Sequence, residues 1–401
     1  MWLFMLISFK YYGYEETWQL WKVPTIMPPF LDFRLIPGSA ESFRRGFEPT
    51  VKNPGDPAGR IFNYPAFWRI FFYSDITQDD TIWISILMIV LFFIGVFLFP
   101  EKLKIPGAIA MLLVVFSPAA MLLYERGNAD LIVFFICVLI VLASGYSANL
   151  TALLVMVGAV VKLFPFFGVS VLLKEAKPKF LLLFGSCFIL LLTYMLVTMD
   201  SVRASWNLTM RGNGLSYGTN ILVARYGERM TRILAHWFST SLIQWLLKYG
   251  PLAAALLLLF SVYVFAARSK TTPETSSQRN LAGFRMGASI YIGTFLLGNN
   301  WDYRLAFLVL VVPQLMDWLM LGDKKYRILA AIGLGAVLLS CWYLITSSQL
   351  DFFANSAEFW VVCDEGINWL LFAILAHLLF ASVPDWVKTQ FQFFLPKQNP
   401  V

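Results

Sequence analysis

Long apolar runs recur along this chain and exclude most soluble folds. A transmembrane helix needs about 20 consecutive apolar residues, and several of these runs approach that length before ending at a charge. The runs cover roughly 82–99, 105–123, 129–144, 180–199, 250–267, 286–298, 303–321, 328–346 and 366–383. Hydrophobic residues are 59% of the 401 and charged residues 14%, against about 45–50% and 25% in soluble domains. A soluble fold cannot bury that much apolar surface, so we expect an all-α polytopic membrane protein.

The charge and the cysteines exclude other classes. A net charge of +7 fits basic cytoplasmic loops of a membrane protein, and no basic run accompanies a groove-reading motif. The four cysteines and two histidines show neither a CxxC pair nor a zinc spacing. We expect no nucleic-acid partner, no metal and no cofactor.

Lysines and arginines in short loops predict the orientation, because they concentrate on the cytoplasmic side. The basic loops are those that contain Lys102, Lys177, Lys270 and Lys324, and the tail contains Lys388 and Lys397. If these loops share the cytoplasmic side, the N-terminus lies there too. The exoplasmic side then receives 10–81, 124–128, 200–249, 299–304 and 347–365. The opening run, Trp2 to Phe9, is too short to span alone, so either it is a thin first span or the true start lies upstream.

This alternation requires segment 147–173 to enter and leave the membrane on one side. Pro165 interrupts the segment just after Lys162, so we expect two half-length helices meeting near Pro165. Broken helices at membrane depth are tolerated where they line a cavity or are buried in protein.

We therefore treat residues 1–401 as one integral membrane domain with four parts. These are a first exoplasmic loop (10–81), a core module (82–199), a second exoplasmic loop (200–249), and C-terminal helices followed by a short cytoplasmic tail (250–401).

Asp32 is the main catalytic candidate. It lies between Leu31 and Phe33 in apolar sequence soon after the first run, where a carboxylate is costly unless it is paired or functional. Arg34 is the structural alternative, as an ion-pair partner. The interesting alternative is a catalytic base.

Five further polar residues lie beside or inside apolar runs. Glu125 and Arg126 either pair with each other or serve a site, and Asp130 either caps the next helix or faces a cavity. Lys162, inside an apolar run, is a functional candidate suited to a phosphate, although it can also snorkel. Arg304 opens a helix, where a cation is unfavourable; it either pairs with Asp302 or binds an anion.

Some of these elements resemble a known family. Arg126-Gly127-Asn128-Ala129-Asp130 followed by Val161-Lys162-Leu163-Phe164-Pro165 resembles a pattern of GT-C membrane glycosyltransferases. The closest types are glycosyltransferase family 87 (the DUF2029 group) and the mannosyltransferase of GPI assembly. Phe30-Leu31-Asp32-Phe33-Arg34 resembles the family's Asp after the first span, and Asn63-Tyr64-Pro65 its Tyr-Pro element. The similarity covers most of residues 25–180, and only Asn299–Arg304 carries it in the second half.

The resemblance implies a GT-C-like bundle of about 11–12 helices, some of half length, with a long structured first exoplasmic loop. It implies inverting transfer of a hexosyl or pentosyl group from a polyprenyl-phosphate sugar to a glycan or lipid acceptor. The reaction would occur at the exoplasmic face of a bacterial inner membrane, in cell-envelope assembly. Asp32 would be the catalytic base. The donor phosphate would be bound by Lys162, Arg126, Arg304 and Arg34, and the cavity lined by Asn128, Asp130, Tyr64, Asn300 and Asp302.

Two other classes compete with a glycosyltransferase. A transporter or lipid-linked sugar flippase also uses broken helices and buried charges, but the sequence shows no inverted repeat, and a transporter has little use for the loop 10–81. A non-catalytic scaffold would leave Asp32 and Lys162 unexplained. Convergence of these two residues on one outward-facing cavity is the observation that separates the classes.

Overall fold

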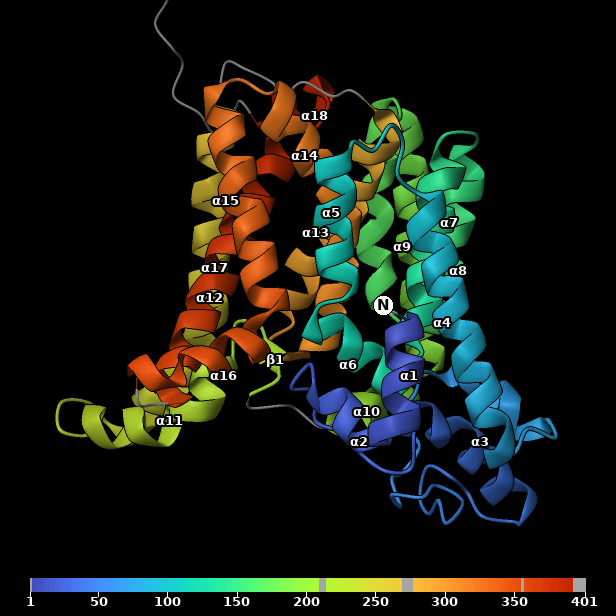
Figure 1. Ribbon diagram of the computed structural model, residues 1–401. Coiled ribbons are helices and arrows are strands. Elements are labelled where there is room, and N and C mark those ends of the chain that lie inside the picture. The colour runs from blue at the N-terminus through green and yellow to red at the C-terminus, as the bar shows by residue number, and fades with distance from the viewer. Residues whose placement is uncertain (1, 209–213, 269–276, 355–356, 392–401) are drawn as a thin grey trace, which may run out of the picture.

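The computed structural model describes residues 2–208, 214–268, 277–354 and 357–391. These residues form a helical bundle enlarged at one end by short helices and loops (Figure 1). Two very short antiparallel strands, β1 (Ser216–Tyr217) and β2 (Asn300–Trp301), join two loops. The all-α class is confirmed. The linker around Lys270 and the tail with Lys397 lie outside the described residues.

In the described part of the chain, five helices are long and apolar enough to span a membrane. They are η2–α4 (Gln78–Asp80 and Thr81–Leu98), α9 (Lys177–Val197), α12 (Thr240–Ala267), η4–α14 (Asp302–Val311 and Val312–Leu321) and α17 (Ala357–Ala381). Two bent pairs raise the number to as many as seven: α5 (Ile105–Val115) with α6 (Pro118–Arg126), and α15 (Lys324–Cys341) with α16 (Tyr343–Ala354). The protein is therefore an integral, multi-pass membrane protein.

Helix α13 (Gln278–Leu296) is the central element of the bundle, since every residue from Asn280 to Phe295 is buried. Glycines permit its close packing, as in other membrane bundles. A Cβ on Gly287 would lie 2.9 Å from Val311 Cγ1 of η4. By contrast, only 6% of the residues in the most apolar stretch of α9 are buried within the protein, so this helix faces lipid.

The segment after α7 (Asp130–Ser144) is broken, as the sequence predicts. Helix α8 (Ala148–Val161) ends before Lys162, whose backbone is extended, and the 3-10 helix η3 (Phe164–Lys174) follows. Lys174 at the end of η3 donates to the carbonyl of Ser144 at the end of α7. The segment therefore returns to the end of the bundle from which it entered.

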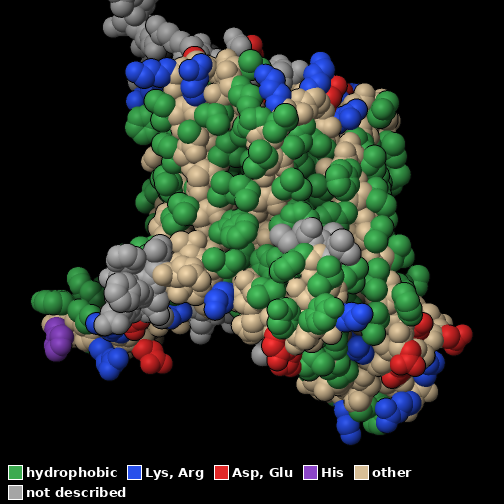
Figure 2. Space-filling model, viewed as in Figure 1, with side chains coloured by type: hydrophobic (Ala, Val, Ile, Leu, Met, Phe, Trp, Pro, Cys, Tyr) green, Lys and Arg blue, Asp and Glu red, His purple; other side chains and the backbone are tan. Residues whose placement is uncertain are grey.

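One end of the bundle carries the lysine-rich loops. Lysine and arginine side chains gather along this end, at the top of Figure 2. Contacts between distant segments fix it: Ser277 Oγ donates to Glu101 Oε2 at 2.6 Å, and Asn280 Nδ2 donates to the Glu101 carbonyl at 3.1 Å. The loop between α4 and α5 therefore meets the start of α13, and the short helix α18 (Asp385–Phe391) lies at the same end.

The opposite end carries segment 10–81 and the chain that precedes α12. It contains α1 (Trp2–Tyr12), α2 (Tyr14–Gln19), α3 (Leu31–Arg44), η1 (Ala66–Tyr73), α10 (Met199–Leu208) and α11 (Ile221–Leu234). One expected boundary is wrong. The second loop does not extend to 249, because α12 begins at Thr240, where the Ser239 side chain caps the helix by accepting from the Leu242 amide. Ser239 is an ordinary N-cap residue, but the polar residues after it conceal the start of the helix.

Candidate functional site

Asp130 is the centre of a buried ionic cluster. Its side chain is fully buried in the first turn of α7, and it pairs with both Lys162 and Arg304. Arg304 Nε lies 3.2 Å from Asp130 Oδ2. The three residues come from α7, from the break after α8 and from η4. Asp130 therefore faces the protein interior and does not cap its helix.

Asn128 connects this cluster to Asp32. Its Oδ1 accepts from Lys162 Nζ at 2.9 Å, and its Nδ2 donates to Asp32 Oδ2 at 2.7 Å. The preceding Gly127 has φ of 56°, and a Cβ there would come within 2.8 Å of Phe30 and Ser85. Only glycine tolerates that combination of left-handed backbone and close contact, so the Arg-Gly-Asn turn presents the amide to both charged groups.

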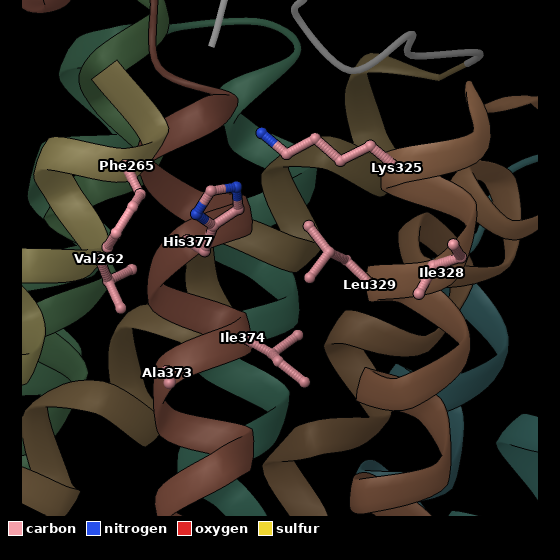
Figure 3. A pocket seen from close by; sticks show the side chains of 8 residues that line it. All are labelled: Val262, Phe265, Lys325, Ile328, Leu329, Ala373, Ile374 and His377. Carbon is pink, nitrogen blue, oxygen red and sulfur yellow. The ribbon is translucent and has the colours of Figure 1, made fainter. Parts of the chain in front are cut away.

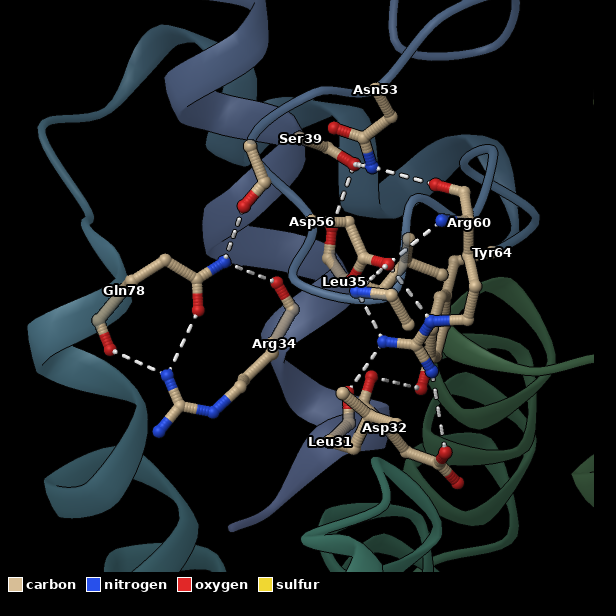
Figure 4. A network of polar contacts seen from close by, with 12 residues as sticks. Leu31, Asp32, Arg34, Leu35, Ser39, Asn53, Asp56, Arg60, Tyr64 and Gln78 are labelled. Atoms are coloured by element: carbon tan, nitrogen blue, oxygen red, sulfur yellow. Dashed lines mark hydrogen bonds and ion pairs between the residues drawn. The ribbon is translucent and has the colours of Figure 1, made fainter. Parts of the chain in front are cut away.

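Asp32, in the first turn of α3, is also bound by a residue that the sequence analysis missed. Arg60 Nη1 lies 3.5 Å from Asp32 Oδ1, and the Asp32 side chain stays 24% exposed. Arg60 is itself held by Asp56 Oδ1 at 2.8 Å from Nη2 (Figure 4). Burial lowers the pKa of Arg60, but the hydrogen bonds and charges of Asp56 and Asp32 outweigh it, so the pKa is raised.

Tyr64 lies beside both parts of the site. Its ring centroid is 5.7 Å from Lys162 Nζ, and its hydroxyl is 3.5 Å from the Asp32 carbonyl. Burial and the Asp32 charge raise the pKa of the Tyr64 phenol well above its ordinary value. The phenol therefore stays protonated at neutral pH and serves as a neutral hydrogen-bond donor.

Asn300 and Phe164 complete the surroundings of Arg304. Arg304 donates to Asn300 Oδ1, and Asn300 Nδ2 donates to the Thr294 carbonyl at 2.5 Å. The guanidinium lies 5.1 Å from the Phe164 ring centroid. Of the ten residues predicted from the sequence, the structure brings seven together: Asp32, Tyr64, Asn128, Asp130, Lys162, Asn300 and Arg304. We call these seven residues and Arg60 the polar network.

Two predicted phosphate ligands lie outside the polar network. Arg34 binds the Pro29 carbonyl at 2.8 Å and Gln78 Oε1 at 3.1 Å, and it points away from Asp32 in Figure 4. Arg126 pairs with Glu125 at 2.9 Å and donates to the Pro24 carbonyl at 3.2 Å. Arg34 is therefore not the partner of Asp32, and for Arg126 the pairing alternative holds. The contacts of both arginines connect the loop 10–81 to the bundle and to itself.

Asp302 also lies apart from the polar network and does not pair with Arg304. It is buried, as are Asp364 and Glu365 of α17. Within the described residues, each of these acids has a side-chain oxygen without a hydrogen-bond partner. No three histidines, cysteines or acids there are arranged to hold a metal ion.

No family model, no curated protein and no solved structure matches the chain. Any functional conclusion therefore rests on the geometry and charge of the site.

The formal charges divide the polar network, taken together with Asp56, into two halves. At one half, Arg60 faces the two carboxylates Asp32 and Asp56, which leaves a net negative charge beside the partly exposed Asp32. At the other half, Lys162 and Arg304 share the single carboxylate of Asp130, which leaves a net positive charge. Asn128 bridges the two halves, so a partly exposed carboxylate lies next to a pair of cations that share a single counter-charge.

Proposed function

We propose that the protein is a glycosyltransferase that uses a polyprenyl-phosphate sugar as its donor. The observation that carries this proposal is the single amide of Asn128 between Asp32 and Lys162. It supports a site in which an acid acts beside a bound phosphate. The resemblance to GT-C enzymes, and to glycosyltransferase family 87 in particular, is part of the same proposal.

Asp32 takes the proton of the acceptor hydroxyl as its oxygen attacks the anomeric carbon of the donor sugar. General-base catalysis of this kind contributes about 10²–10⁴-fold to a rate. The bond between the anomeric carbon and the phosphate oxygen breaks, and the phosphate leaves with the electron pair. Attack opposite to the leaving phosphate inverts the anomeric centre.

Lys162 and Arg304 stabilise the charge that develops on the leaving phosphate. Asp130 holds both cations in place before the substrate arrives, and preorganised charges need no rearrangement during the reaction. The phosphate also neutralises the surplus positive charge on this side of the network. Because the donor is a lipid, it reaches the site from the membrane, and no nucleotide-binding fold is required.

In this proposal the site faces the exoplasmic side of a bacterial inner membrane and serves cell-envelope assembly. The support is the lysine-rich loops at the opposite end of the bundle, which belong in the cytoplasm. The polar network then lies at the outer end, beneath the loop 10–81.

The test is an assay of the purified protein with a panel of radiolabelled polyprenyl-phosphate sugars. We expect transfer to an acceptor, or hydrolysis of one donor. Asp32→Asn keeps the side-chain shape and removes the base, so turnover should fall at least about a hundred-fold, with donor binding largely retained. Asp75→Asn, an exposed acid of the same loop, is the matched control and should behave like the wild type.

The same preparation separates the enzyme from a flippase. Reconstituted into vesicles, a flippase would move the intact lipid-linked sugar across the bilayer without cleaving it. Movement without bond cleavage, equal in wild type and Asp32→Asn, would exclude the glycosyltransferase.

A further inference from the structure

A groove lies at the lysine-rich end, far along the bundle from the polar network. It has a volume of about 500 Å³, within the range of small-molecule sites. Helices α12, α15 and α17 form its walls. Its lining residues are Val262, Phe265, Lys325, Ile328, Leu329, Ala373, Ile374 and His377.

The groove is amphipathic along its length. In Figure 3, Lys325 of α15 and His377 of α17 lie toward one end, and the aliphatic side chains of Ile374 and Leu329 lie below them. His377 Nε2 has no hydrogen-bond partner among the described residues. The ammonium of Lys325 and the imidazole of His377 therefore lie at one end of a groove that is otherwise apolar.

The groove is open to the surroundings of the bundle at its side. Phe265 is 66% exposed and Ile328 49% exposed on its two rims. In a membrane, apolar side chains at these positions face lipid, so a ligand enters laterally from the bilayer. This lateral access favours a lipid over a soluble anion.

We propose that this groove binds an anionic phospholipid of the leaflet at the lysine-rich end. The phosphate lies between Lys325 and His377, and one acyl chain lies along Ile374 and Leu329. The charge is complementary, since Lys324, Lys325 and Arg327 begin α15, and anionic lipids are attracted to such basic membrane-flanking residues. This site takes no part in the reaction at Asp32, and it stands whether or not that reaction is the one proposed.

The test is native mass spectrometry of the full-length protein, titrated separately with phosphatidylglycerol, phosphatidylcholine and inorganic phosphate. We expect one phosphatidylglycerol to be retained in preference to phosphatidylcholine, and inorganic phosphate not to displace it. Lys325→Gln should weaken retention about tenfold or more, as expected for losing a charge-assisted hydrogen bond.

Two matched controls distinguish a seated lipid from diffuse attraction. Lys324→Gln removes the same charge from the adjacent exposed residue outside the groove, and should change retention about twofold at most. Ile328→Trp narrows the groove and should reduce retention with every charge kept. Ile332→Trp, also exposed on α15 but outside the lining, should not.

Four results would overturn the proposal. Three of them are equal losses in Lys324→Gln and Lys325→Gln, equal retention of phosphatidylcholine, and displacement by inorganic phosphate at matched concentration. Equal behaviour of Ile328→Trp and Ile332→Trp would also remove the groove as the place of the acyl chain.

Discussion

Lys162 has two roles, one in the proposed binding of the donor and one in the stability of the protein. It is the proposed phosphate ligand and also a partner of the buried Asp130. Lys162→Ala should weaken donor binding and turnover together by about tenfold or more, since the cation contacts the ground state and the transition state alike. Lys162→Arg should rescue at most part of this, because a planar fork does not replace a compact ammonium. Binding isotherms and initial rates measure both effects.

A variant that keeps the second cation separates the two roles of Lys162. Lys162→Met removes one charge but leaves Asp130 Oδ2 paired with Arg304 Nε at 3.2 Å, so no carboxylate is left buried without a partner. We expect the thermal unfolding of Lys162→Met to lie closer to the wild type than that of Asp130→Asn, which leaves two cations without their counter-charge, while Lys162→Met still binds the donor weakly. Normal donor binding and transfer in Lys162→Met would show that Lys162 only neutralises Asp130.

The partner of Asp32 shows how far sequence reasoning reaches at this scale. Arg34 is near Asp32 in the chain, but residues two apart on a helix do not face each other, and both belong to α3. The true partner, Arg60, comes from a loop 28 positions later and is oriented by Asp56. Local spacing indicated that Asp32 is unusual, whereas its ion pair depends on how the loop folds back.

At the scale of elements, the packing of α13 against η3 depends on missing side chains. A Cβ on Gly293 would lie about 2.4–2.5 Å from atoms of the Phe167 ring. Gly293→Ala should lower the unfolding free energy by about 1–3 kcal/mol, the usual cost of overpacking a core. Denaturant unfolding in detergent micelles measures this change.

Gly185 of α9 is the matched control for that substitution. A Cβ there meets nothing within 4 Å, so Gly185→Ala gains only helix propensity, up to about 1 kcal/mol. If both variants lose stability equally, the effect comes from the backbone of a helical glycine and not from the contact with Phe167.

The break between α8 and η3 was predictable, and the bends of two other pairs were not. Pro165 and the need for an even alternation of basic loops both indicated the break. The pairs α5–α6 and α15–α16 bend by 50° and 75°, although each reads as one apolar run. An apolar run predicts burial in lipid or protein, but the direction of the helix axis depends on contacts with neighbouring helices. One such contact is the hydrogen bond that the Trp342 indole donates to the Leu113 carbonyl at 2.8 Å.

Across the whole molecule, the loops of the described residues separate into two ends as the lysine count predicts. Helix α1 is the exception, because the count expects the N-terminus at the lysine-rich end and α1 lies at the opposite end. That count needs only the parity of the spans and so survives errors in individual boundaries, such as the start of α12. The contacts of the polar network cannot be predicted from such a count, because none of them follows a local sequence pattern. The network joins α3, the loop with Arg60, the turn before α7, the α8–η3 break and η4. The orientation of the molecule also decides which compartment can supply the acceptor.

The orientation itself is tested by single cysteines in intact cells, in a background without the four native cysteines. Ser348, exposed at the end that carries the loop 10–81, and Lys104, exposed at the lysine-rich end, are the two positions. We expect Ser348→Cys to react with a membrane-impermeant maleimide from outside, because the basic loops hold the other end in the cytoplasm. Lys104→Cys should react only after the membrane is permeabilised. Labelling of Lys104→Cys in intact cells would show that the protein is inserted in the opposite orientation. Asp32 would then lie on the cytoplasmic side, where an outward-facing transfer from a polyprenyl-phosphate sugar is impossible.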